Sequence, residues 1–262
     1  MSSPSLQKHL LTAVEAAREV GELMKLHRLR RKQVNQTTAH DLKLELDVRS
    51  QRKIARHLAR NHPEIPVLGE EESDPTHSEA PLRWVVDPID GTVNFASGIP
   101  HACVSIALEK RTDSGAFESV VGVIYDPFND ELWTARKGGP ALRNGRRIHP
   151  STVDELSQSM VSLGFAQSEV SLNTSLRYFT ILTPKVRKLR IMGSAALAMA
   201  YVADGRFDAY LEAGLRRWDI AAGRLILECA GGVADCVPIA GEHAFAVKCH
   251  NGQLGPELAR TL

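Results

Sequence analysis

Two aspartates three residues apart, Asp87 and Asp90, follow an apolar run and could do chemistry together. Val85 and Val86 suit a buried strand, and we expect this strand to end at Pro88, which has no N–H to donate. Both carboxylates would then lie in one tight turn at the carboxyl end of a strand. Open α/β sheets usually bind their ligands at that edge.

Gly91 and Thr92 come next and could begin a helix whose free N–H groups point at an anion. Hard carboxylate oxygens beside such a helix start predict a site for Mg²⁺ and a phosphate group. Other acidic residues also stand at the ends of expected elements: Asp41, Asp47, Glu70 and Asp219. If these ends converge, they form a pocket of like charges that needs divalent cations.

Several of these acids also have an ordinary structural interpretation. Asp219, directly after Trp218, could be a helix N-cap, and Glu70 in a run of three glutamates could be solvated surface. Asp41 is typical of a turn or cap. The pair Asp87 and Asp90 favours function, because Asp87 follows a buried run and precedes a second aspartate.

Composition excludes several classes of protein. The 262 residues are 24% charged and 43% hydrophobic with a net charge of +1, which gives no reason to expect nucleic acid as the main partner. The four cysteines form no C-x-x-C pair, which argues against a zinc cluster and for a reduced, cytoplasmic protein. We expect no signal peptide, because the first residues lead directly into a polar amphipathic segment, and no apolar run approaches the roughly 18–20 residues of a membrane span.

Hydrophobic spacing predicts two helices at the start of the chain, over about 5–26 and 47–61, with a polar break at 35–40. A largely antiparallel sheet should follow, with a hairpin turn at Asn144-Gly145. Its expected strands are 65–68, 83–87, 103–109, 119–125 and 131–135.

The second half should contain strands at about 160–165, 190–192 and 207–212, a helix opened by Gly193-Ser194, and a helix over 218–230 that Gly231-Gly232 ends. Closing strands are expected beyond residue 233, and loops near 165–183. No flexible linker separates the halves, so we expect residues 1–262 to form one domain. Its halves, about 1–148 and 149–262, would pack as one unit.

The motif W-V-V-D-P-I-D-G-T-V-N-F at 84–95 resembles the signature of the inositol monophosphatase family. Gly69-Glu70-Glu71 is similar to an upstream block of that family. Two further blocks also resemble it, Gly193–Ala196 with 202–210, and 218–223 followed by Glu228 and Gly231-Gly232. The blocks stand in the family's order and cover most of the chain.

The resemblance implies an α+β fold, the layered α-β-α-β-α sandwich of the inositol monophosphatase and fructose-1,6-bisphosphatase type. It also implies a homodimeric, Mg²⁺-dependent phosphomonoesterase that acts on a small phosphorylated metabolite. By resemblance, Glu70, Asp87 and the carbonyl of Ile89 hold one Mg²⁺, and Asp87, Asp90 and Asp219 hold a second.

The resemblance assigns the remaining roles too. Gly91 and Thr92 meet the phosphate, Glu212 receives substrate hydroxyls, and Asp90 and Asp219 also face the substrate. The rest of the pocket is formed by Gly193, Ser194, Ala195 and Ala196. We expect a water molecule to attack phosphorus, with Glu70 and either Thr92 or Asp47 orienting it and accepting its proton.

One segment departs from the family pattern. Between Asp41 and Asp47, Lys43 and Leu44 stand where valine and threonine are usual, and Gln36 replaces an upstream lysine. Leu44 has no hydroxyl to bind Asp47 or a metal-bound water. This segment therefore leaves open whether a weak third metal site exists.

The sequence does not name the substrate. An inositol phosphate is the first expectation and histidinol phosphate an alternative. A bisphosphatase for fructose 1,6-bisphosphate or 3′-phosphoadenosine 5′-phosphate is less favoured, because Glu212 would repel a second phosphate. A regulatory binding protein that has lost catalysis is a further alternative.

Overall fold

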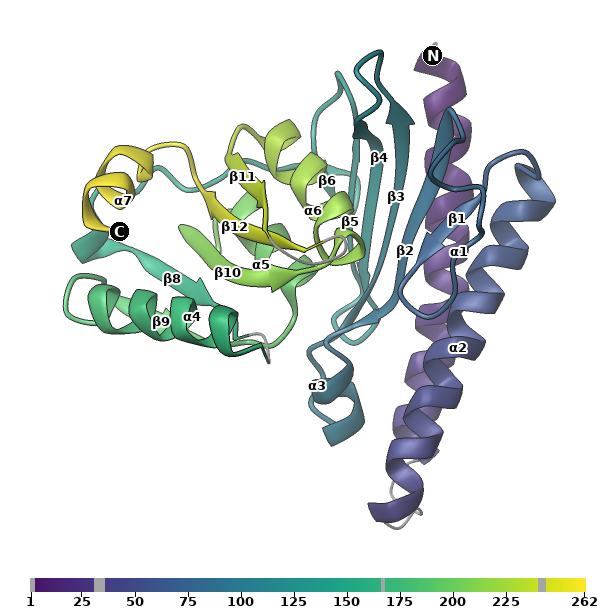
Figure 1. The fold of residues 1–262 in the computed structure, drawn as a ribbon, viewed down its shortest axis with the longest axis horizontal. Helices are drawn as coiled ribbons and strands as arrows, with labels where there is room; N and C mark the ends of the chain where they lie inside the picture. Colours follow the sequence, from purple (N-terminus) through teal and green to yellow (C-terminus); the bar gives the residue numbers. More distant parts are fainter. Residues whose placement is uncertain (1–2, 31–35, 166–167, 240–243) are drawn as a thin grey trace.

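The computed structural model describes residues 3–30, 36–165, 168–239 and 244–262 (Figure 1). Helices α1 (Ser3–Arg30) and α2 (Gln36–Asn61) lie side by side and form the first layer. In α1, the side chains of Ala13, Ala17, Val20 and Met24 recur at helical spacing and are fully buried. The expected polar break at 35–40 is wrong from Gln36 onward, because that stretch has no glycine or proline to stop a helix.

The second layer is a sheet whose strands follow one another in sequence order. It is antiparallel except for the parallel pair β1–β2, as the hydrophobic runs predicted. Its strands are β1 (Val67–Gly69), β2 (Leu82–Asp90), β3 (Cys103–Arg111), β4 (Phe117–Asp126), β5 (Glu131–Arg136), β6 (Leu142–Arg143) and β7 (Arg146–Arg147). The predicted hairpin turn is confirmed, with positive φ at both Asn144 and Gly145.

The sequence suggested that strand β2 ends at Pro88. That expectation is wrong, because β2 continues to Asp90. The register of its pairing with β3 shifts between Asp87 and Asp90. Pro88 therefore lies in a bulge, where its missing N–H removes no regular ladder bond. The short helix α3 (Thr92–Ser97) follows directly.

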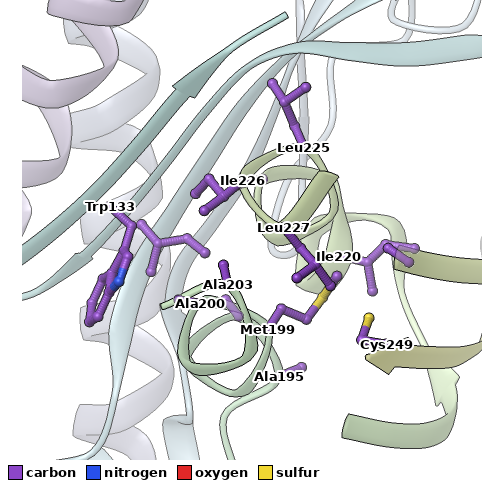
Figure 2. Close-up of a cluster of buried hydrophobic side chains, with 14 of the residues drawn as sticks. Trp133, Ala195, Met199, Ala200, Ala203, Ile220, Leu225, Ile226, Leu227 and Cys249 are labelled. Atoms are coloured by element: carbon purple, nitrogen blue, oxygen red, sulfur yellow. The ribbon is translucent and has the colours of Figure 1, made fainter. Parts of the chain in front are cut away.

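Helices α5 (Ala195–Ala203) and α6 (Arg217–Ala230) form the middle layer, close to their predicted positions. Figure 2 shows their side chains packed between Trp133 of β5 on one side and Cys249 of the second sheet on the other. Small residues let these helices approach closely, since a Cβ on Gly223 of α6 would lie 2.8 Å from the Cβ of Met199. This buried cluster contains residues of both halves, which supports our proposal that 1–148 and 149–262 form one unit.

The second sheet and its outer helices complete the α-β-α-β-α sandwich (Figure 1). The strand order is β11-β12-β10-β8-β9, with β8 (Met160–Leu163), β9 (Lys188–Arg190), β10 (Ala209–Leu215), β11 (Val233–Pro238) and β12 (Phe245–His250). Helices α4 (Glu169–Leu182) and α7 (Gly255–Thr261) pack on its outer face, where Leu163, Leu182, Leu211 and Leu258 are buried together. Helix α4 corrects the expectation of loops near 165–183, of which 166–167 lie outside the described residues.

Gly122 of β4 tests the contact between the first sheet and the middle layer. A Cβ at this position would lie 2.8 Å from the backbone oxygen of Ala222 in α6, and neither backbone can move freely. We expect Gly122→Ala to lower the free energy of unfolding by roughly 1–3 kcal/mol in urea denaturation. Gly139→Ala, whose Cβ would meet only the Arg136 oxygen at 3.4 Å, is the control. Equal stability of the two variants would contradict the packing described.

Candidate metal centre

Three carboxylates from distant parts of the chain converge where β2 ends. Asp87, Asp90 and Asp219 each present an oxygen, and these oxygens all lie within 4.8 Å of one another. Side chains three residues apart in a regular strand point to opposite faces. The bulge between Asp87 and Asp90 breaks that alternation, so both can face the same cluster.

Asp90 is held by the start of α5, although that helix lies in the other half of the chain. The backbone N–H groups of Ala195 and Ala196 donate to its carboxylate at 3.3 and 2.8 Å, and the Ser194 hydroxyl donates to it as well. Ser194 also accepts the N–H of Leu197, as an N-cap does. The partial positive charge of this helix start stabilises a carboxylate in that position.

Asp219 lies in the first turn of α6 and accepts the backbone N–H of Arg216 at 2.6 Å. The helix-capping interpretation is therefore correct in part, and the same side chain also joins the carboxylate cluster. A contact with β3 fixes this turn, since the Ser105 hydroxyl donates to the carbonyl of Trp218 at 3.3 Å.

A buried ion triad holds the same turn from the side. Glu109 of β3 is fully buried and binds the Arg217 Nε at 2.6 Å and the Arg83 Nε at 2.9 Å. Removing one partner of such a group is strongly destabilising, because it leaves an uncompensated charge in the interior. Arg217 comes two residues before Asp219, so the triad fixes the helix start that carries the ligand.

Glu70 reaches the cluster from the loop after β1. Its backbone N–H donates to the carbonyl of Val86 at 3.2 Å, which places the loop beside β2. Its carboxyl group interacts with that of Asp87 and raises the pKa of Asp87. Glu70 is exposed, as the surface interpretation of the three glutamates assumed, yet it also lies against the buried aspartates.

The cluster is electrostatically unfavourable when its members are ionised. Burial, followed by the charges of Glu70, Asp90 and Asp219, raises the pKa of Asp87 well above its ordinary value. Burial and the charge of Asp90 raise the pKa of Asp219 in the same way. Burial also raises the pKa of Asp90, against the hydrogen bonds that it accepts from Ser194 and α5.

Gly91 and Thr92 connect the cluster to α3. Gly91 has φ +88°, and a Cβ there would lie 2.8 Å from the carbonyl oxygen of His101, so this close approach requires glycine. The Thr92 hydroxyl donates to the carbonyl of Ile89 at 3.2 Å. A carbonyl oxygen has two lone pairs, so that of Ile89 keeps one for a cation.

Glu212 lies on β10, seven residues before Asp219. Burial and the charge of Asp90 raise its pKa to about 7, while a hydrogen bond from the Tyr210 hydroxyl acts in the opposite direction. A Cβ on Gly164 would overlap the Glu212 carboxylate, so the glycine leaves the space that this carboxylate occupies. A carboxyl that is half ionised near pH 7 and held in a fixed orientation is suited to hydrogen bonds with hydroxyl groups.

The structure places the remaining predicted residues in different ways. Asp47 is buried on α2, and Gly193 precedes α5 with φ +74°. Ala195 and Ala196 are buried and direct their N–H groups at Asp90, so their contact with a substrate stays a prediction. The side chains of Gln36, Asp41, Lys43 and Leu44 lie outside the described residues, and so does the weak third metal site.

Sequence reasoning assigned no role to several residues that shape the site. Asn94 donates to the carbonyls of His101 at 3.0 Å and Met192 at 2.7 Å, joining α3 to the loop before α5. Its place within the 84–95 motif was the available signal. Cys103 approaches Asp90 with its sulfur at 3.6 Å, and no local pattern marks it.

The donor set fits divalent cations. Hard oxygen ligands, buried together with mutually raised pKa values, favour ions such as Mg²⁺, Mn²⁺ or Ca²⁺ over softer metals. Asp87, Asp90 and Asp219 would hold such an ion, with Glu70 and the Ile89 carbonyl beside them.

Comparison with known proteins decides the family. The model of the inositol monophosphatase family matches residues 5–249. The chain belongs to the inositol monophosphatase family. It is 39% identical over 246 residues to an inositol monophosphatase of Dictyostelium discoideum, covering 89% of this chain and 86% of that protein. It is also 39% identical over 222 residues to a Xylella fastidiosa protein named Nus factor SuhB, covering 84% and 78%.

Solved structures of this family share the fold. The inositol monophosphatase of Anabaena (Nostoc) sp. PCC 7120 superposes with a TM-score of 0.85 at 33% identity, covering 98% of this chain and 96% of that one. Family membership and the acidic cluster support a metal-dependent phosphatase. Within the described residues, no helix of this family member is both long and apolar enough to cross a membrane.

The raised carboxyl pKa values predict how the metal-free chain responds to pH. Between the ordinary and the raised values, the folded chain binds more protons than the unfolded chain, so stability falls as pH rises. We expect Tm in EDTA to decrease as pH rises from about 4.5, the ordinary pKa of the Glu212 carboxyl, to about 7, its raised pKa in the folded chain. Mg²⁺ should reduce the decrease, because it neutralises the same charges.

Calorimetric melts with EDTA and with Mg²⁺, compared at each pH, remove the contribution of other titrating groups. Glu212→Gln should flatten the EDTA curve in part, since one of the raised carboxyls is gone. Parallel curves with and without Mg²⁺ would show that no cation neutralises this cluster.

Proposed function

We propose that this chain is a Mg²⁺-dependent phosphomonoesterase that hydrolyses a small polyol or sugar monophosphate. The observation that carries the proposal is the convergence of Asp87, Asp90 and Asp219, with Glu70 against Asp87. Two bound Mg²⁺ ions would neutralise phosphate oxygens and lower the pKa of water at this site. Family membership supports the phosphatase class. The proposed substrate class is argued from the residues around Glu212.

The residues of the chain perform the remaining tasks in this proposal. Glu70 accepts a proton from the attacking water, and the Thr92 hydroxyl, fixed on the Ile89 carbonyl, orients that water. Asp47 supports this arrangement from α2. The water oxygen forms a bond to phosphorus while the bond to the ester oxygen breaks, and the departing oxygen takes a proton from solvent.

The phosphate and the alcohol are recognised by different elements. The backbone N–H groups of Gly91 and Thr92 bind the phosphate, and Gly193 and Ser194 form the wall beside it. Glu212 accepts hydrogen bonds from hydroxyl groups of the alcohol, which favours inositol phosphates or histidinol phosphate. Its partial negative charge disfavours a second phosphate, so fructose 1,6-bisphosphate and 3′-phosphoadenosine 5′-phosphate are poorer candidates.

A regulatory binding role is the second candidate. It is favoured by relatives that carry the name Nus factor SuhB, such as that of Xylella fastidiosa. A chain that binds Mg²⁺ and a stable protein partner but releases phosphate from no substrate would support this role.

We also propose a cytoplasmic location. The unpaired thiols of the four cysteines suit the reducing cytoplasm.

The phosphatase proposal predicts that Asp87→Asn separates activity from stability. Asparagine keeps the shape and still accepts the Ile89 N–H, but one buried charge is lost. Phosphate release in Mg²⁺ should fall at least about 100-fold. That is the largest loss of activity typical of groups that only support a metal ligand, and Asp87 is proposed as a ligand itself. Tm in EDTA should stay equal or rise, because repulsion among the carboxylates decreases.

A screen of phosphate release covers inositol phosphates, histidinol phosphate, sugar phosphates and the two bisphosphates, with and without Mg²⁺. Asp113→Asn, an exposed aspartate of the β3–β4 hairpin, is the matched control and should behave like the unsubstituted chain. Normal turnover of Asp87→Asn at ordinary Mg²⁺ would contradict the proposed site.

We also propose a homodimer. Leu172, Leu176 and Phe179 are partly exposed at i, i+4 and i+7 on α4, and Val170 of the same helix is 75% exposed. An apolar face of this kind is typical of an interaction site. Leu176→Glu with Phe179→Glu should convert a dimer to a monomer in sedimentation equilibrium, while Leu11→Glu, at an exposed position of α1, should not. A monomeric unsubstituted chain would disprove the dimer.

A further inference from the structure

The loop that carries Glu70 is held by one side chain of α2. The carboxamide nitrogen of Gln51 donates to the carbonyl of Glu72 at 2.5 Å, and its oxygen accepts the backbone N–H of Glu71 at 2.9 Å. Both bonds attach to backbone directly after Glu70. Gln51 thus fixes the path of the chain on the side of Glu70 away from β1.

Gln51 is well suited to hold this position. Gln51 is only 3% exposed, so water does not compete for the two hydrogen bonds. Gly69 packs directly on the carboxamide, since a Cβ there would lie 2.4 Å from the Gln51 amide atoms. The Ser73 hydroxyl closes the loop by donating to the Gly69 carbonyl at 3.0 Å and accepting the Gly69 N–H at 3.2 Å.

The two bonds require one donor and one acceptor on the same planar group. A carboxamide supplies both, whereas a carboxylate has no donor and methionine has neither. Gln51 also lies four residues after the buried Asp47, so both side chains lie on the same face of α2. Exposed Arg52, in contrast, binds the same loop only through the Glu72 carboxylate, at the surface.

We propose that Gln51 is a positioning residue of the metal centre, which holds the Glu70 carboxyl at the distance from Asp87 needed to bind a divalent cation. The proposal rests on the proposed function, in which Glu70 is a metal ligand. Gln51 touches neither the cation nor the substrate and acts through the backbone of residues 69–72. Groups that orient a ligand in this way affect metal affinity before they affect the fold.

The test is Mg²⁺ binding by isothermal titration calorimetry on the full chain after removal of metal. Gln51→Met keeps the length of the side chain and removes both hydrogen bonds, so we expect the Kd for Mg²⁺ to rise roughly 10-fold. The control Arg52→Gln removes the exposed ion pair with the same loop, and its Kd should change less than about twofold. Circular dichroism in EDTA confirms that each variant is folded.

Steady-state kinetics supply a second measurement. If Gln51 had a purely structural role, its substitution would not change the dependence of activity on Mg²⁺ concentration. The Mg²⁺ concentration for half-maximal phosphate release should rise in Gln51→Met, while turnover at saturating Mg²⁺ recovers most of its original value. Gly69→Ala disturbs the same contact while residue 51 remains glutamine, because the added methyl group displaces the Gln51 carboxamide. The variant that combines Gln51→Met with Gly69→Ala should bind Mg²⁺ no more weakly than whichever single variant has the higher Kd, since both substitutions act through one contact.

The outcomes separate this proposal from the proposed function. Absence of Mg²⁺ binding in the unsubstituted chain would overturn both. Mg²⁺ binding in the unsubstituted chain, with an unchanged Kd in folded Gln51→Met, would overturn the role of Gln51 and leave the phosphatase proposal standing. If Gln51→Met does not fold, an unchanged Kd in Gly69→Ala overturns it, and a raised Kd supports it.

Discussion

Mutual repulsion among buried carboxylates is the constraint on which this structure depends. Asp87, Asp90 and Asp219 lie within 4.8 Å of one another, and burial raises the pKa of each. The hydrogen bonds described for these carboxylates come from neutral donors such as the Ile89 N–H and the Ser194 hydroxyl, which orient charge without neutralising it. The fold therefore presents a site whose ionised form is stabilised by divalent cations.

Contacts between the two halves hold these charges together. The start of α5 binds Asp90, Asn94 binds the carbonyl of Met192, and the buried Glu109 binds Arg217 at the start of α6. These contacts form because the middle helices approach the first sheet closely through small residues such as Gly122. Packing of the sandwich and geometry of the site are thus one problem, since a shift of α5 or α6 would move a ligand.

Much of the fold could be predicted from local patterns. Gly193-Ser194 and Gly231-Gly232 mark helix ends because their backbone preferences act over a few residues, and the structure confirms both helices. Local rules were wrong where packing overrides them. Pro88 did not end β2, because a bulge accommodates a residue without an N–H, and α4 forms where loops were expected, because a sheet covers its inner face.

The sequence by itself determined which residues are available for chemistry: the acidic pair in the 84–95 motif, Glu70 and Asp219, in an order that resembles one family. Tertiary structure decided which of them meet, since Asp219 comes 129 positions after Asp90 and no local rule acts over that distance. It also decided their pKa values and the roles of Gln51, Tyr210 and Gly164. Burial and electrostatic interaction depend on neighbours in space, and only the packed layers supply those neighbours.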